Sequence, residues 1–486
     1  MLLSDLPSDI IILVLYHVPV SDLAALCTTC KLFHDLVNSF GFQIHLRLNP
    51  RPSFSLAKAR QIWHPRIQLQ YNTLSDKSWS SSRFVARPLS YPWPRKQQPC
   101  LAINASRLVV SAGSIIYSYA FETPKGTGSP PLRFEGSASI HGDSQWDITA
   151  LAFINDDGQG RTLMCGFRNG TLARVTLTKG DSSNTLLLEI DMEINHQQHT
   201  RDIIESISAS GSLYLSLSSK GKANLVNIQS PNTSVSQIDL ATRSWTTHIS
   251  TEGTPYVAFG CSSASTPGTV YSILEGSISH TPTAILGTTN GLSKFATAVY
   301  GICRAPYASP WGASPQILVT GWFDGQVRIY DLRSSSSMDP DPSTTSSSSS
   351  SSSFSAPLRP VMSLSDPWSL ESVYSVSSGG GACSHLAAGS ARHSVVSFWD
   401  IRYPKSGWSV YAPGNDHSPV YSVLLESSRV FGVTDSRPFV YDFGPHVTQD
   451  TYPHVAPSPG LKPRRSNSGY YVTRYSHGRG SLLNDH

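Results

Sequence analysis

The chain has 486 residues, of which 39% are hydrophobic and 14% are charged, and it contains 35 glycines and 33 prolines. This composition favours many short strands joined by turns and excludes a coiled coil or a helical solenoid, which would need far more Glu, Lys and Leu. The formal net charge of +4 gives no indication of nucleic-acid binding, and seven sparse cysteines favour a reducing compartment, the cytoplasm or the nucleus, over a disulfide framework.

Residues 1–48 are the only stretch with clear helical periodicity. Pro7 stands at the start of an aliphatic run that ends near Val18, and a second helix start follows at Asp22. The apolar run is too short to span a bilayer, so no membrane partner is expected. A module of under 50 residues cannot bury so many aliphatic side chains alone, and we therefore expect it to dock on a partner.

The motif of this module resembles the F-box. It consists of Leu6-Pro7-Ser8-Asp9, an aliphatic helix, then Asp22-Leu23, and finally Cys30-Lys31-Leu32-Phe33. The resemblance implies a domain over residues 1–48 that docks on the Skp adaptor and, through it, on a cullin. The side chains that we assign to this contact are aliphatic residues and one proline: Leu6, Pro7, Ile10, Ile11, Val14, Leu15, Val18, Leu23 and Leu26.

Residues 49–98 read as a linker, and residues 99–444 contain a repeat of strands and turns. The clearest unit spans residues 317–333 and turns at Asp324-Gly325, a dipeptide typical of tight hairpins. Seven such hairpins are predicted, at residues 108–121, 163–175, 213–228, 256–274, 317–333, 386–402 and 429–443. Short apolar strands flank several of them. Four strands per unit, repeated seven times, predict a mainly β chain that forms a seven-bladed β-propeller.

The repeat resembles the WD-repeat family in Thr320-Gly321, Asp324-Gly325 and Tyr330-Asp331, and again in Trp399-Asp400. The resemblance implies that Thr320, Asp324 and Tyr330 belong to a buried hydrogen-bond network. An F-box followed by a WD-repeat propeller is the arrangement of substrate receptors in Skp–cullin–F-box ubiquitin ligases. It implies a protein substrate held on the propeller.

The last hairpin lacks an obvious fourth strand, which another part of the chain must supply. Residues 67–71 and 83–87 are candidates, and residues 469–475 are the rival. The Ser-rich insertion 334–357 cannot bury apolar surface and is predicted to be disordered. The polar, proline-containing tail 445–486 is predicted to be disordered as well.

No catalytic, metal or cofactor site can be assembled from the sequence. Cys27 and Cys30 lack a second cysteine pair at zinc-ribbon spacing. The glycine run 379–381 is not followed by the Lys-Ser/Thr of a phosphate-binding loop. Because no paired catalytic carboxylates can be placed either, we expect a protein that is not an enzyme.

The turns between second and third strands should ring one mouth of the propeller channel. The residues proposed there for substrate binding are basic or aromatic: Arg168, Lys220, Trp322, Phe323, Arg392 and Arg437. They predict a basic, aromatic-lined mouth for an acidic or phosphorylated segment, although scattered charges on polar turns would give the same pattern. Two alternatives to a substrate receptor stay open: a scaffold that binds the Skp adaptor outside a cullin complex, and a propeller enzyme.

Overall fold

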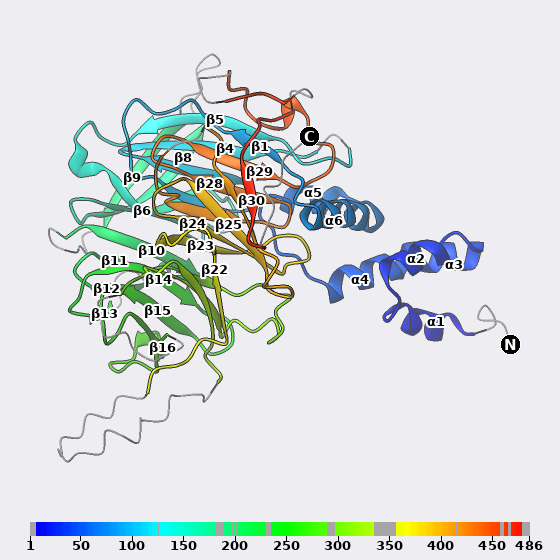
Figure 1. The fold of residues 1–486 in the computed structure, drawn as a ribbon, viewed down its shortest axis with the longest axis horizontal. Helices are drawn as coiled ribbons and strands as arrows, with labels where there is room; N and C mark the ends of the chain where they lie inside the picture. Colours follow the sequence, from blue (N-terminus) through cyan, green and yellow to red (C-terminus); the bar gives the residue numbers. More distant parts are fainter. Residues whose placement is uncertain are drawn as a thin grey trace.

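Seven antiparallel sheets surround a central channel, and an arm of short helices projects from one side of them (Figure 1). The computed structural model describes residues 6–124, 126–179, 188–195, 199, 202–229, 235–288, 297–334, 356–414, 417–456, 461–464 and 468–478. The mainly β fold and the seven blades predicted from the repeat are confirmed. No helix in these residues is long and apolar enough to cross a membrane.

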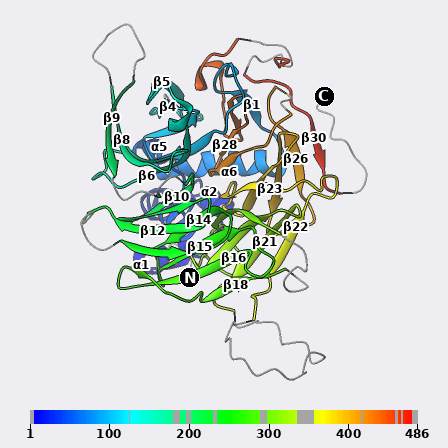
Figure 2. The ribbon, with the colours of Figure 1, turned by 90° about the vertical axis from the view of Figure 1, so that its left-hand side faces the viewer.

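Each blade runs outward from an inner strand that lines the channel (Figure 2). Blade 1 contains β2 (Cys100–Ile103), β3 (Arg107–Ala112), β4 (Ile115–Phe121) and β5 (Leu132–Ser139). Blade 2 contains β6 (Ile148–Phe153), β7 (Thr162–Phe167), β8 (Leu172–Lys179) and β9 (Leu188–Asn195). Blade 3 contains β10 (Ile204–Ser210), β11 (Leu213–Ser218), β12 (Lys222–Asn227) and β13 (Ser236–Asp239). Blade 4 contains β14 (Ser244–Ser250), β15 (Tyr256–Cys261), β16 (Gly268–Leu274), β17 (Ser277–Ile278) and β18 (Ala284–Leu286).

Blades 5 to 7 complete the ring. Blade 5 contains β19 (Val299–Arg304), β20 (Ile317–Trp322), β21 (Gln326–Asp331) and β22 (Met362–Ser365). Blade 6 contains β23 (Val373–Gly379), β24 (His385–Ser390), β25 (Val395–Asp400), β26 (Trp408–Tyr411) and β30 (Arg474–Ser476). Blade 7 contains β27 (Ser422–Leu425), β28 (Arg429–Val433), β29 (Pro438–Asp442) and β1 (Val85–Pro88). All seven predicted hairpins coincide with the second and third strands of a blade.

The strand that closes blade 7 comes from the stretch before blade 1. β1 pairs antiparallel with β29, from Val85 opposite Asp442 to Pro88 opposite Phe439, so the closing strand overlaps the candidate stretch 83–87 and extends one residue beyond it. Residues 67–71 were the wrong candidate, because they lie in helix α6 (Pro65–Ser80), which starts with a proline and is capped by the side chain of His64. The rival stretch 469–475 is wrong as well: β30 adds a fifth strand to blade 6.

The blades pack face to face, and the second strand of most blades is buried along its whole length. A glycine near the end of this strand permits the close approach of the next blade. A Cβ atom on Gly321 would lie 2.6 Å from Val373 Cγ1, and one on Gly389 would lie 2.8 Å from Val420 Cβ. The repeated Gly of the sequence is therefore required where one blade meets the inner strand of its neighbour.

The helical arm and the linker precede the propeller. The arm contains α1 (Ser8–Leu15), α2 (Val20–Leu26), α3 (Lys31–Leu36), a π-helical turn (Val37–Gly41) and α4 (Phe42–Leu48). The linker contains α5 (Ala57–Ile62) and α6, which lie against the propeller (Figure 1). The predicted linker is thus largely helical, and Leu69 of α6 joins the small core of the arm.

The tail is not uniformly without structure, which corrects the expectation for the described stretches 445–456 and 468–478. Tyr452 is buried against blades 1 and 7, and Tyr470 is buried with its hydroxyl donating to Val455 O. Large aromatic side chains in an otherwise polar tail explain why it packs. Residues 335–355 of the Ser-rich insertion lie outside the described residues.

Candidate functional site

Helix α1 presents an exposed aliphatic face. Ile10 is 41% exposed, Leu13 is 60% exposed and Val14 is 40% exposed, and they recur at the i, i+3, i+4 spacing of one helix face. Tyr16 and Leu32 extend the apolar surface with 45% and 37% exposure. Such a surface on a small module is typical of a protein-docking site.

Three of the side chains that the sequence assigned to this contact are buried instead. Ile11, Leu15 and Leu23 form the core of the arm together with Phe33 and Val37. The half-buried members of the predicted set, Leu6, Val18 and Leu26, pack against this core, while Pro7 is exposed. Helix α1 is apolar on all sides, and only its 3.6-residue period separates the core face from the docking face. That period could have identified Leu13, which the sequence reasoning missed.

The second site is the mouth of the propeller that carries the turns between second and third strands. Of the residues proposed there, Arg168, Lys220, Phe323 and Arg392 are exposed. Trp322 is completely buried and Arg437 is only 4% exposed, so neither side chain lies at the surface of this mouth. Trp322 ends β20 and points into the interface between blades 4 and 5, where neighbouring side chains cover it.

The buried Trp322 belongs to the polar network that the WD resemblance implied for other residues. Its Nε1 donates to Thr320 Oγ1 at 2.6 Å, and Tyr330 donates its hydroxyl hydrogen to Gly287 O. Asp324 differs from the expectation, because its side chain is 40% exposed and pairs with Arg328 at 2.5 Å. The Arg328 guanidinium also lies 4.6 Å from the centre of the Trp322 ring. These residues hold blade 5 together.

The cations at the mouth lie beside carboxylates. Arg168 is 3.8 Å from Asp147, and the backbone N–H of Lys220 donates to the Asp202 carboxylate at 3.0 Å. Arg243 lies 3.0 Å from Glu205. Burial raises the pKa of Glu205 above its usual value, although Arg243 opposes this shift. The predicted basic character is therefore locally compensated by acidic neighbours.

A set of β-bulges builds the inner rim of this mouth. In five blades the pairing between the first and second strands skips one residue near the start of the inner strand. The skipped residues are Thr149, Glu205, Trp245, Tyr300 and Tyr374, and all five line the central cavity. The bulge turns each side chain toward the channel instead of into a blade interface.

The bulge residues of blades 4 to 6 form an aromatic arc that continues to blade 7. The ring centres of Trp245 and Tyr300 are 5.0 Å apart, those of Tyr300 and Tyr374 are 5.1 Å apart, and those of Tyr374 and Tyr421 are 6.5 Å apart. These distances fall in the range of favourable aromatic pairs. The arc is half-buried and borders a channel cavity of about 610 Å³.

A second cavity of about 770 Å³ continues from the channel to the outer rim between blades 5 and 6. Tyr300 and Tyr374 line both cavities. The outer part is bordered by Phe323, Trp368 and Leu370, which are 52%, 62% and 90% exposed. Together these two cavities form what we call the aromatic trough.

Comparison with protein-family models matches the F-box domain to residues 3–45. The chain carries an F-box domain followed by a seven-bladed β-propeller. No curated protein matches the sequence. Among solved structures, Sqt1 of Chaetomium thermophilum, crystallised with the N-terminus of the ribosomal protein L10, is similar with a TM-score of 0.47 and 16% identity, over 70% of this chain and 81% of that one.

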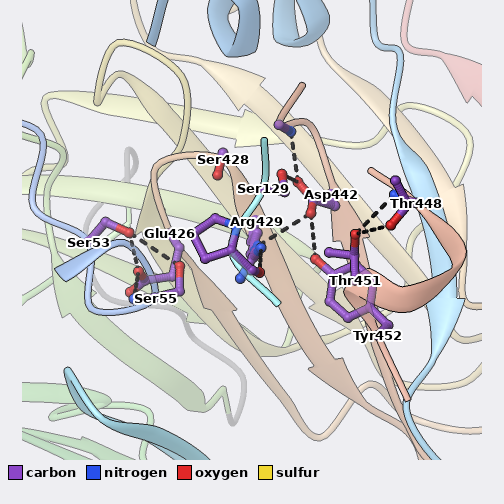
Figure 3. Close-up of polar contacts among 12 residues, drawn as sticks. Ser53, Ser55, Ser129, Glu426, Ser428, Arg429, Asp442, Thr448, Thr451 and Tyr452 are labelled. Atoms are coloured by element: carbon purple, nitrogen blue, oxygen red, sulfur yellow. Dashed lines mark hydrogen bonds and ion pairs between the residues drawn. The ribbon is translucent and has the colours of Figure 1, made fainter. Parts of the chain in front are cut away.

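The F-box is joined to the propeller through a buried polar cluster on the face where first strands turn into second strands (Figure 3). Glu426, between β27 and β28, accepts hydrogen bonds from Ser53 Oγ at 2.5 Å and from the backbone N–H of Ser55 at 2.9 Å. Burial raises the pKa of Glu426 above its usual value, although these hydrogen bonds oppose the shift. The linker thus supplies hydrogen-bond donors to a carboxylate that is only 6% exposed.

An ion pair lies next to Glu426 in the same cluster. Arg429 Nε is 3.3 Å from Asp442 Oδ2, and neither side chain has any exposed surface. Tyr452 of the tail donates its hydroxyl hydrogen to Asp442 Oδ2 at 2.5 Å (Figure 3). The tail and blade 7 are therefore fixed to each other below the channel.

Trp79 at the end of α6 anchors the linker to the same face. Its ring stacks on Phe443 with the centres 3.6 Å apart, and its Nε1 donates to Ser427 O at 3.1 Å. The glycine run 379–381 lies directly beneath: all three glycines have positive φ, and a Cβ on Gly380 would be 3.1 Å from the Trp79 ring. The absence of side chains in this run leaves the space in which Trp79, at the end of α6, packs against the propeller.

The F-box and the aromatic trough lie at opposite ends of the propeller. Linker contacts involve loops between first and second strands, whereas the trough is bordered by turns between second and third strands. Figures 1 and 2 show the helices on one side and the open ends of the blades on the other. Within the described residues, no group of three or more His, Cys, Asp or Glu side chains could hold a metal ion.

Proposed function

We propose that this F-box protein is a substrate receptor of a Skp–cullin–F-box ubiquitin ligase, acting in the cytoplasm or the nucleus. The F-box binds the Skp adaptor, which connects it to a cullin, and the propeller mouth holds a protein substrate for ubiquitination and proteasomal degradation. The bond-making chemistry belongs to other subunits. The observation that carries this proposal is the exposed face of Ile10, Leu13 and Val14 on a domain that projects away from the mouth.

The energetics of this face support docking on the adaptor. Full burial of an aliphatic side chain of this size is worth about 1.5–3 kcal/mol. Three adjacent side chains left between 40% and 60% exposed therefore carry enough free energy to anchor a partner. The core below them already contains Ile11 and Leu15, so the exposed face is not needed to fold the F-box.

The test is co-purification of the full chain with the Skp adaptor and a cullin. Ile10→Asp combined with Val14→Asp should weaken adaptor binding by more than about a hundredfold, because both charges enter an apolar interface. Ile62→Asp is the matched control, since Ile62 is 59% exposed on the linker outside the F-box. It should change binding by less than about twofold. Undiminished binding of the double variant would refute the assignment of this face.

The same experiment separates the receptor from a scaffold. A receptor brings down both the Skp adaptor and a cullin, whereas a scaffold brings down the adaptor alone. Failure to bind the adaptor at all would remove both functions.

A further inference from the structure

We infer that the aromatic trough recognises an unmodified, extended polypeptide segment with apolar side chains, not an acidic or phosphorylated one. This inference rests on the proposed receptor function and specifies the chemistry of its substrate. The inner half of the aromatic trough accepts one aromatic or aliphatic side chain at the channel mouth, and the outer half accepts a second one at the rim. The two halves share Tyr300 and Tyr374, so one segment can occupy both.

The inner half is built for burial of a flat or branched apolar group. Trp245, Tyr300, Tyr374 and Tyr421 line one half of the channel mouth, whereas blades 2 and 3 contribute Thr149 and Glu205 at the equivalent bulges. A cavity of about 610 Å³ is larger than a single side chain and falls in the size range of ligand sites. Because the aromatic residues lie on one side of the channel mouth, a bound apolar side chain should pack against blades 4 to 7.

The outer half presents large apolar side chains that are mostly exposed to solvent. Leu370 is 90% exposed, Trp368 is 62% exposed and Phe323 is 52% exposed, and they border the same cavity. Solitary apolar side chains are common on protein surfaces, but three that border one cavity form a patch. Aromatic anchors of this kind dominate the binding energy of many interfaces.

The charges around the trough disfavour an anionic ligand. Arg243 is already engaged, with its guanidinium 3.9 Å above the Trp245 ring and 3.0 Å from Glu205. At the rim, Glu371 accepts hydrogen bonds from the backbone N–H groups of Arg392 and His393 and adds a carboxylate to the lining of the cavity. Arg392 also borders this outer cavity, and Glu371 balances its charge, so a phosphate would find no net positive charge here, whereas an uncharged segment needs none.

The test uses two phage-displayed dodecapeptide libraries, one random and one with a fixed phosphoserine, screened against the full chain in complex with the Skp adaptor. The random library should yield peptides with two aromatic or aliphatic residues and no excess of acidic ones. Trp368→Ala with Leu370→Ala should weaken the selected peptides by about thirtyfold, and Tyr374→Ala should weaken them to a similar extent. Melting temperatures of the variants establish that the propeller remains folded.

Two further variants make the outcome decisive. Tyr403→Ala is the matched control, because Tyr403 is 66% exposed after β25, outside the lining of both cavities, and it should leave peptide binding unchanged. Arg168→Glu with Lys220→Glu, at two exposed mouth residues that line neither cavity, should change binding by less than about threefold. Enrichment of acidic or phosphorylated peptides that this charge swap abolishes would overturn the inference, and so would the absence of any enriched peptide. In either case, if the chain still bound the Skp adaptor, the result would refute the predicted ligand chemistry and not the proposed receptor function.

Discussion

The two ends of the propeller use the same kinds of side chain in opposite ways. On the linker face, charged groups are removed from water: Arg429 and Asp442 have no exposed surface, and Glu426 is 6% exposed. At the mouth, ion pairs remain at the surface and aromatic rings are half-exposed. The linker is fixed to blade 7 because Ser53 and Ser55 donate to the buried Glu426, and a buried carboxylate that loses its donors is costly. The mouth keeps apolar surface free for a reversible contact.

The largest effect should come from breaking the buried ion pair of the linker face. Arg429→Met leaves Asp442 buried without its cation, so we expect the free energy of unfolding to fall by about 3–5 kcal/mol. Chemical denaturation of the full chain measures this loss. An effect below about 1 kcal/mol would mean that water reaches Asp442 and that the linker face is no more rigid than the mouth.

The matched control for this variant is Arg402→Met. Arg402 pairs with Asp400 at 2.7 Å, but the arginine side chain is 44% exposed. Solvent screens such a pair, and its removal should cost no more than about 1 kcal/mol. The difference between the two variants isolates the contribution of burial from that of the charge itself.

Two tryptophans make the next comparison, with a smaller expected effect. Trp79 and Trp368 both donate an indole N–H to a backbone carbonyl, to Ser427 O and Ser476 O, but they are 2% and 62% exposed. Trp79→Phe should cost about 2 kcal/mol, because Ser427 O loses one of its two donors and a small cavity remains. Trp368→Phe should stay within about 0.5 kcal/mol. Equal melting-temperature shifts for the two variants would contradict the assigned roles.

The sequence predicted the repeated parts of the molecule better than the parts that occur once. Every hairpin was found because a short turn between apolar strands recurs seven times, in three cases as Asn169-Gly170, Lys220-Gly221 or Asp324-Gly325. Residues 67–71 were misread because Ile67, Leu69 and Tyr71 alternate as in a strand, although Pro65 and the length of the segment favour a helix. The sequence was also a poor guide to burial. Trp322 directly precedes a turn and was expected to be exposed, but it packs in the interface between blades 4 and 5.

The sequence placed basic turn residues at the candidate mouth but did not reveal the carboxylates beside them. Carboxylates such as Asp147 and Glu205 are distant in sequence from the arginines that they neutralise, so no local pattern reveals the pairing. The bulge that turns Tyr300 and Tyr374 toward the channel depends on the pairing of two strands. Such features require the assembled sheet.

The pH dependence of stability should distinguish Glu426 from a surface carboxylate. Its pKa in the folded protein is raised above the ordinary value of 4.5, mainly by burial. The folded state therefore binds a proton that the unfolded state releases, and stability falls as the pH rises from 4.5 through the raised pKa. Relative to Glu426→Gln, the wild-type protein should lose up to about 1.4 kcal/mol per pH unit in this window. Parallel curves of unfolding free energy against pH would show that Glu426 is not desolvated by the linker.

The smallest effect on stability should come from the rim of the mouth. Leu370→Ser removes a side chain that is 90% exposed, and Phe323→Ser removes one that is 52% exposed. Neither side chain belongs to an apolar core cluster of the propeller, so each substitution should change the free energy of unfolding by less than about 0.5 kcal/mol. Differential scanning fluorimetry should then record shifts of about 2 °C or less. A loss above 1 kcal/mol would indicate that the rim supports blade 5 or 6, and the exposed apolar surface would no longer require a partner to explain it.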